Sequence, residues 1–251
     1  MAGFKDVFQR IEVKYLLDDT QYTELMKRLE NMAAIDSYGK TSILNIYFDT
    51  PDFKLIERSL DKPVYKEKLR LRTYGTAKDD TNAFIEIKKK YKGVVYKRRI
   101  SMPYSEAMDY LVNGKPIEKR SQISDEIDYF LQYYKGIRPA MAISYDRIAM
   151  AGIEDPDLRI TFDTNIRWRT DRLSLKEGNR GKDILLPGQH LMELKIAGAM
   201  SMELARILDE LNIRKTSFSK YGKGYVEYMY GKAVGEEERE TEKIALFRAA
   251  V

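Results

Sequence analysis

The stretch DLRITFDTNIRWR, residues 157–169, alternates polar and apolar side chains almost without interruption. Successive side chains of a β-strand point to opposite faces of a sheet, so this period of two predicts a strand with one polar and one apolar face. The predicted polar face carries Asp157, Arg159, Thr161, Asp163, Asn165, Arg167 and Arg169. The predicted apolar face carries Leu158, Ile160, Phe162, Ile166 and Trp168.

The same alternation recurs on both sides of this stretch and predicts further strands. They lie at 7–17, 43–49, 65–74, 83–91, 94–101, 140–150 and 190–196. The charged residues expected on the polar faces are Arg10, Glu12, Lys14, Lys66, Lys68, Arg70, Arg72, Glu86, Lys88, Lys90, Lys97, Arg99, Arg147, Arg159, Asp163, Arg167, Glu193 and Lys195. Because cations far outnumber carboxylates in this set, we predict an α+β protein built on a closed antiparallel β-barrel, with a basic polar lumen and helices packed outside.

A lumen crowded with cations requires an anion or water, because unpaired buried charge is costly. Phosphate chains suit it, since arginine binds phosphate oxygens through a bidentate fork and lysine supplies a compact charge. The sparse carboxylates suit a divalent metal ion, which prefers oxygen ligands and bridges phosphates. The alternative is an antiparallel sheet with one solvated face, whose cations only confer solubility. The predominance of Arg and Lys across so many strands favours the lumen.

Composition narrows the chemistry further. The 251 residues carry a net charge of +5 and include no cysteine and one histidine, His190. This excludes thiolate metal sites and cysteine nucleophiles, and it leaves little scope for a Ser-His triad. The N-terminal segment lacks an apolar signal region, and no stretch approaches the ~18 apolar residues of a spanning helix. We therefore expect a soluble cytoplasmic protein without a membrane span.

The remaining segments predict helices and a single domain. Helical periodicity or bounding Gly and Pro residues indicate helices at 21–32, 104–113, 122–135 and 201–211, and a loop entering a helix at 217–231. Neither an internal repeat nor a linker interrupts the chain. We predict one domain over residues 1–231, followed by a charged tail at 232–251 that is helical or disordered.

Eight short motifs then follow one another in a specific order. They are RIEVKY (10–15), LRLR (69–72), EIKKK (86–90), YKRR (96–99), SYDR (144–147), LRITFDT (158–164), MELKI (192–196) and SFSKY (217–221). Together they resemble the catalytic domain of the vacuolar transporter chaperone (VTC) polyphosphate polymerases, within the triphosphate tunnel metalloenzyme (CYTH-like) superfamily. The resemblance spans about residues 8–228.

This resemblance implies an eight-stranded antiparallel tunnel that binds ATP and a growing inorganic polyphosphate chain, with Mn²⁺ or Mg²⁺ as cofactor. It implies a phosphotransferase that moves the γ-phosphate of ATP onto the chain. With the polar-face positions, it assigns catalytic roles to Arg70, Arg72, Lys88, Arg147 and Arg159. It assigns phosphate or polyphosphate binding to Lys14, Lys97, Arg99, Lys195, Ser219 and Lys220. The metal ligands are expected to be Glu193 and Glu12.

The sequence departs from the tunnel hydrolases at one position. Those enzymes begin with Glu-x-Glu-x-Lys, whereas here Arg10 stands at the first acidic position. The change disfavours an inorganic triphosphatase or nucleotide phosphohydrolase, which stays an alternative beside a non-catalytic polyphosphate-binding module. Nucleic acid is not an expected partner, because the polar-face positions of 68–72, 86–90 and 159–167 hold no stacking aromatic residue. A tyrosine near the tunnel mouth is a candidate to stack on adenine.

Overall fold

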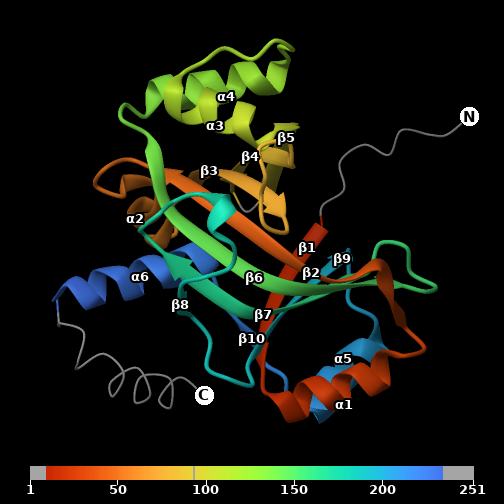
Figure 1. The fold of residues 1–251 in the computed structure, drawn as a ribbon. Helices are drawn as coiled ribbons and strands as arrows, with labels where there is room; N and C mark the ends of the chain where they lie inside the picture. Colours follow the sequence, from red (N-terminus) through yellow and green to blue (C-terminus); the bar gives the residue numbers. More distant parts are fainter. Residues whose placement is uncertain (1–9, 93, 234–251) are drawn as a thin grey trace, which may run out of the picture.

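The computed structural model describes residues 10–92 and 94–233 (Figure 1). Its strands are β1 (Arg10–Leu17), β2 (Ala33–Asp49), β3 (Tyr65–Tyr74), β4 (Asn82–Tyr91), β5 (Val94–Pro103), β6 (Arg138–Gly152), β7 (Arg159–Arg169), β8 (Lys182–Asp183), β9 (His190–Ala197) and β10 (Lys215–Thr216). Its helices are α1 (Asp19–Leu29), α2 (Lys54–Leu60), α3 (Tyr104–Asn113), α4 (Gln122–Tyr133), α5 (Met202–Glu210) and α6 (Lys220–Ala233), with a 3₁₀ turn at Leu175–Glu177. The predicted tail lies outside the described residues from position 234 onward.

The ten strands of the described ranges belong to one antiparallel sheet. Its order is β10-β1-β9-β7-β6-β2-β3-β4-β5, with β8 paired to β7. The predicted closed barrel of eight strands is therefore wrong. Within residues 10–92 and 94–233, eight strands are long and β8 and β10 have two residues each. The hydrogen-bonded path there ends at β10 and β5 instead of closing. The sheet nevertheless curls, because Lys88 of β4 reaches Glu12 of β1 at 3.9 Å although five strands lie between them in the sheet order.

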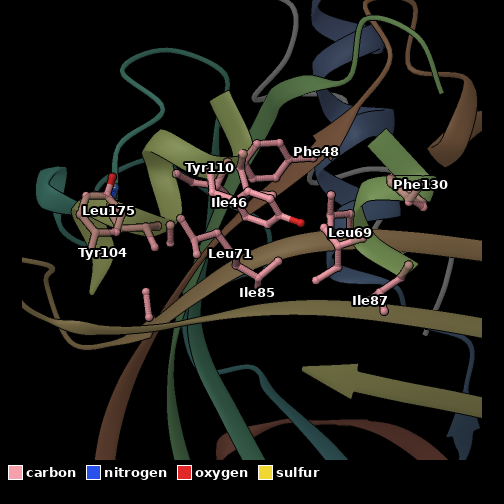
Figure 2. Packing of buried hydrophobic residues seen from close by; sticks show 14 of the residues in the cluster. Ile46, Phe48, Leu69, Leu71, Ile85, Ile87, Tyr104, Tyr110, Phe130 and Leu175 are labelled. Carbon is pink, nitrogen blue, oxygen red and sulfur yellow. Dashed lines mark hydrogen bonds between the residues drawn. The ribbon is translucent and has the colours of Figure 1, made fainter. Parts of the chain in front are cut away.

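The outer face of the sheet is apolar and carries helices, as predicted. Over β2, β3 and β4, side chains such as Phe48, Leu69 and Ile85 pack against Tyr110 of α3 and Phe130 of α4 (Figure 2). Over β1, β7 and β9, a second apolar core forms against α1 and α5, two helices that lie next to each other in Figure 1. The charged residues of alternate parity must then point to the opposite side, which we call the inner face. None of the helices in the described ranges is long and apolar enough to cross a membrane.

Helix α6 departs from the prediction that all helices pack outside. Its Tyr221 and Tyr225 join Met141 and Ile143 of β6 in a third core, which lies on the inner face. The backbone of α6 approaches the sheet closely at Gly224, where an added Cβ would stand 2.8 Å from the Met141 sulfur. A side chain at this position would push the helix away. The inner face is therefore apolar under α6 and charged beyond it.

The alternation in β7 is broken at Asn165, whose φ of 50° is left-handed. One extra residue on β7 shifts its register against β6, so that Asp163 pairs with Arg147 and Trp168 pairs with Ile143. Asp163 and Trp168 consequently share the inner face, although they are an odd number of residues apart.

The predicted placement of Arg167 with Asp163 is wrong, because Arg167 turns to the opposite face and binds Asp183 of β8 at 2.9 Å.

Candidate functional site

Charged side chains from seven strands and the start of α6 meet on the inner face. We call this set the inner cluster. It comprises Glu12 and Lys14 of β1, Lys68, Arg70 and Arg72 of β3, Glu86 and Lys88 of β4, Lys97 of β5, Arg147 of β6, Asp163 of β7, Glu193 and Lys195 of β9, and Lys220 of α6. Nine of the thirteen are cations and four are carboxylates. The parity predicted from the sequence thus brings most of the proposed site residues together.

Glu86 organises one part of the inner cluster. It is 1 % exposed and faces Arg70 across the β3–β4 pairing, with the Arg70 Nη2 atom 2.6 Å from its Oε2. The Lys97 Nζ atom lies 2.6 Å from Oε1, and an Arg72 nitrogen lies 3.8 Å from Oε2. Burial acts to raise the pKa of Glu86, but the charges of Arg70, Arg72 and Lys97 outweigh it and lower the pKa to about 2. Glu86 therefore remains ionised and holds the two arginines in place.

Three polar side chains that sequence reasoning missed fix the directions of these arginines. Arg70 donates to the Tyr47 hydroxyl at 3.1 Å. Arg72 donates to the Asn45 amide oxygen at 2.9 Å and to the Tyr145 hydroxyl at 3.3 Å. Their parity was a usable signal, because Tyr145 stands two residues before Arg147 and therefore shares its face.

Asp163 organises a second part, beneath the start of α6. It is fully buried and accepts two hydrogen bonds from Arg147, at 2.6 and 2.7 Å. Lys220, the first residue of α6, lies 2.5 Å from its second oxygen. Burial opposes the charge of Asp163, yet Lys220 and Arg147 lower its pKa. Asp163 therefore fixes the direction of the Arg147 guanidinium group.

The third part joins β1, β9 and β4. The Oε1 atom of Glu193 lies 2.9 Å from the Lys195 Nζ atom, and its Oε2 atom lies 3.7 Å from the Lys14 Nζ atom. The Oε1 atom of Glu12 lies 3.5 Å from the Lys14 Nζ atom, and its Oε2 atom lies 3.9 Å from the Lys88 Nζ atom. Burial acts to raise the pKa of Glu193, but Lys195, Lys14 and Lys220 lower it overall. Two carboxylates thus stand on either side of one lysine.

Lys68 has no carboxylate within ion-pair distance in the described part of the chain. Its Nζ donates to the hydroxyl of Ser219, at 3.4 Å, and Ser219 also accepts a hydrogen bond from the Gly222 amide in the first turn of α6. Burial, followed by the charges of Lys66, Lys88, Lys14 and Arg70, lowers the pKa of Lys68 to about 7. An anion placed among these groups would restore its full charge.

We expect inorganic triphosphate to bind with uptake of a proton by Lys68 above pH 7. Free Lys68 loses its proton as pH rises through about 7, so affinity should fall by at most about tenfold per pH unit between pH 7 and 9. Arginine stays charged throughout this range, so Lys68→Arg should remove that part of the pH dependence. Titration calorimetry at pH 8 in buffers of different ionisation enthalpy counts the protons. Equal proton uptake in both proteins would contradict the prediction.

Several predicted residues lie outside the inner cluster. Arg159 is exposed and donates to the backbone carbonyls of Pro156 and Leu158 at 2.9 Å. Arg99 lies on the inner face but is exposed, and its guanidinium stands over Phe84 instead of over a carboxylate. The side chain of Arg10 is outside the described part of the structure. Arg159 is therefore the one predicted catalytic residue that the structure does not bring to the others.

The donor set around Glu193 fits a divalent metal ion that is held partly by substrate. No three carboxylate or histidine side chains gather into a metal-binding group in the described residues. Mg²⁺, however, is commonly bound by one or two carboxylates together with phosphate oxygens and water. Thr161 pairs with Glu193 across β7 and β9, and its buried hydroxyl has no hydrogen-bond partner among the described residues. Glu193, Glu12 and Thr161 therefore offer oxygen atoms on the inner face.

Comparison with known proteins places the chain in a family. Solved structures of similar fold include a candidate adenylate cyclase from Bacillus halodurans, with TM-score 0.53 and 16 % identity over 84 % of this chain and 93 % of that one. They also include a candidate adenylyl cyclase from Hippeastrum with a dominant triphosphatase activity, with TM-score 0.54 and 14 % identity over 87 % of this chain and 96 % of that one. The curated proteins contain no significant match. The VTC domain family model matches residues 9–229, and the chain belongs to this family.

Proposed function

We propose that the protein is a polyphosphate polymerase-like phosphotransferase, which moves the γ-phosphate of ATP onto a growing inorganic polyphosphate chain. The observation that carries the proposal is the charge balance of the inner cluster, in which nine cations surround four carboxylates that are already ion-paired. Such an excess of partly buried positive charge is stable only beside anions or water. A linear phosphate chain supplies negative charge along the whole length of the inner cluster.

In the proposed reaction, Arg70 and Arg72 hold the γ-phosphate through charge-assisted hydrogen bonds. A terminal oxygen of the polyphosphate chain attacks the γ-phosphorus while the bond from that phosphorus to the β–γ bridging oxygen breaks. ADP leaves with the bonding electrons, and the chain gains one phosphate. The attacking oxygen is already ionised, so no proton has to be removed from it. Catalysis then depends on in-line positioning and neutralisation of charge, which fixed cations supply.

The buried carboxylates favour transfer over hydrolysis. A general base that activates water works best with a pKa near the operating pH. The pKa of Glu86 is held at about 2, and the pKa values of Asp163 and Glu193 are also lowered. These three carboxylates are therefore poor proton acceptors at neutral pH. An ionised phosphate nucleophile avoids this difficulty.

Mn²⁺ or Mg²⁺ would be held by Glu193, with Glu12 and the Thr161 hydroxyl nearby. When bound there, the ion supplies further neutralisation of phosphate charge. Lys14 and Lys195 contact the Glu193 carboxylate. With the ion bound, the two lysines would either share this carboxylate with the ion or turn toward the phosphates. In the second case they would bind phosphate oxygens directly.

A triphosphatase is the second candidate, because the cations of the inner cluster would hold inorganic triphosphate as well as ATP. A triphosphatase activity is also described for the Hippeastrum protein of similar fold. The two candidates differ in their products.

Incubation of the purified protein with ATP and Mn²⁺, with separate detection of ADP, free phosphate and phosphate chains, tests the proposal. Long chains with matching ADP, both absent from an Arg70→Ala/Arg72→Ala variant, are expected. Free phosphate without chains would establish the triphosphatase instead. Polyphosphate binding without turnover would leave a binding module.

A further inference from the structure

Three planar side chains gather at the end of β3 that is farther from α6. The Tyr74 and Phe84 rings meet edge to face, with centroids 5.7 Å apart and planes at 81°. The guanidinium carbon of Arg99 lies 4.9 Å from the centroid of the Phe84 ring. We call Tyr74, Phe84 and Arg99 the planar cluster. Tyr74 and Phe84 lie just outside the ranges 68–72 and 86–90, whose polar-face positions hold no aromatic residue.

The planar cluster continues the inner cluster along the same face. Tyr74 stands two residues after Arg72 on β3, and Phe84 stands two residues before Glu86 on β4. The register pairs Arg72 with Phe84 and Glu86 with Arg99. Two residues of a strand span about 7 Å, so the Tyr74 ring begins roughly one nucleotide unit beyond the arginine forks.

These rings are not explained by core packing. Phe84 belongs to none of the three apolar cores, and Tyr74 is 48 % exposed. A cation–π contact accounts for Arg99 above Phe84 but leaves the exposed Tyr74 ring without a role. Flat aromatic and guanidinium surfaces beside a cationic groove are the elements that bind a nucleobase by stacking. The cations of the inner cluster lie nearby, so a base that is attached to phosphates is favoured over a base alone.

We propose that Tyr74, Phe84 and Arg99 bind the base of the nucleoside triphosphate whose phosphates lie on Arg70 and Arg72. The inference rests on the proposed function in one respect, namely that phosphates occupy the inner cluster. It adds a specificity: the protein distinguishes a nucleoside triphosphate from inorganic triphosphate by stacking. Phosphates arriving without a base, including the polyphosphate chain itself, would not use the planar cluster.

Calorimetric titration with ATP and with inorganic triphosphate tests this inference. Tyr74→Ala combined with Phe84→Leu should weaken ATP binding by about tenfold, a loss typical of removing an aromatic ring that stacks on a base. Binding of inorganic triphosphate should be unchanged, which also shows that the variant is folded. Tyr74→Phe keeps the ring and should bind ATP like the unaltered protein. Tyr96→Ala removes an exposed tyrosine from the opposite face of β5 and serves as the matched control.

The outcomes separate the two proposals. Weaker ATP binding with unchanged triphosphate binding supports the planar cluster. Equal ATP binding in the double variant, with triphosphate still bound, overturns the planar cluster and leaves the proposed function standing. If the unaltered protein binds neither anion, the proposed function fails and the planar cluster is overturned with it. Equal weakening of both anions would mean that the rings only support Arg72, which also overturns the inference.

Discussion

Arg72→Ala should lower kcat/KM for ATP-dependent phosphate transfer by about 10²–10³-fold, the loss typical of removing one preorganised donor to a developing negative charge. Arg72 is 6 % exposed, and hydrogen bonds to Asn45 and Tyr145 hold its guanidinium group, so its orientation is set before substrate arrives. In Arg72→Ala, water would fill the space left by the guanidinium group, and this water would have to be ordered around the phosphate again in each turnover. A steady-state ADP-release assay measures the effect.

Two further variants give this prediction its controls. Arg72→Lys keeps the charge but loses the planar fork, so it should fall between the alanine variant and the unaltered protein. Arg98→Ala removes a half-exposed arginine that faces outward and pairs with Glu126, and it should leave kcat/KM unchanged. Activity of Arg72→Ala within about threefold of the unaltered protein would show that Arg72 does not touch the transferred phosphate.

Asp163→Asn should lower the free energy of unfolding by about 3–5 kcal/mol, because it leaves two largely buried cations without their counter-ion. Arg147 donates both of its bonds to this carboxylate, and Lys220 lies 2.5 Å away. The start of α6 is anchored here, so its packing on the inner face should loosen as well. Urea unfolding followed by circular dichroism measures the change.

A second measurement distinguishes this electrostatic cause from simple loss of packing. An anion that binds only the folded state stabilises it. In Asp163→Asn the two unpaired cations are free to bind such an anion, so inorganic triphosphate should raise the free energy of unfolding more in this variant than in the unaltered protein. Asp125→Asn alters an exposed carboxylate that pairs with Arg120 and should change stability by less than about 0.5 kcal/mol. An Asp163→Asn protein as stable as the unaltered one would contradict the account of this ion-pair group.

Strand parity was enough to predict most of the inner cluster. Lys14, Arg70, Glu86 and Glu193 were placed on one face from alternation alone, and the family resemblance added Lys220 and the neighbouring Ser219, which contacts Lys68. Parity works here because the opposite face must bury apolar side chains under helices, so a slip by one residue would expose the core. The match of the VTC domain model to residues 9–229 confirmed the family.

The parts that could not be predicted depend on contacts distant in sequence. The bulge at Asn165 reverses the faces of Ile166, Arg167 and Trp168, and a single left-handed asparagine gives little warning of it. The open sheet path is set by which edges pair, which alternation does not specify. The position of α6 on the inner face depends on its fit to Met141 and Trp168 at Gly224, a fit that exists only in the folded protein.

A crystal structure of the protein grown with inorganic triphosphate would show whether phosphate binds to the inner cluster. We expect phosphate oxygens within hydrogen-bond distance of the Arg70 and Arg72 guanidinium groups and of the Lys88 and Lys68 ammonium groups, on the inner face beyond the start of α6. Triphosphate bound elsewhere, with Arg70 and Arg72 still holding only Glu86, Tyr47, Asn45 and Tyr145, would contradict this expectation.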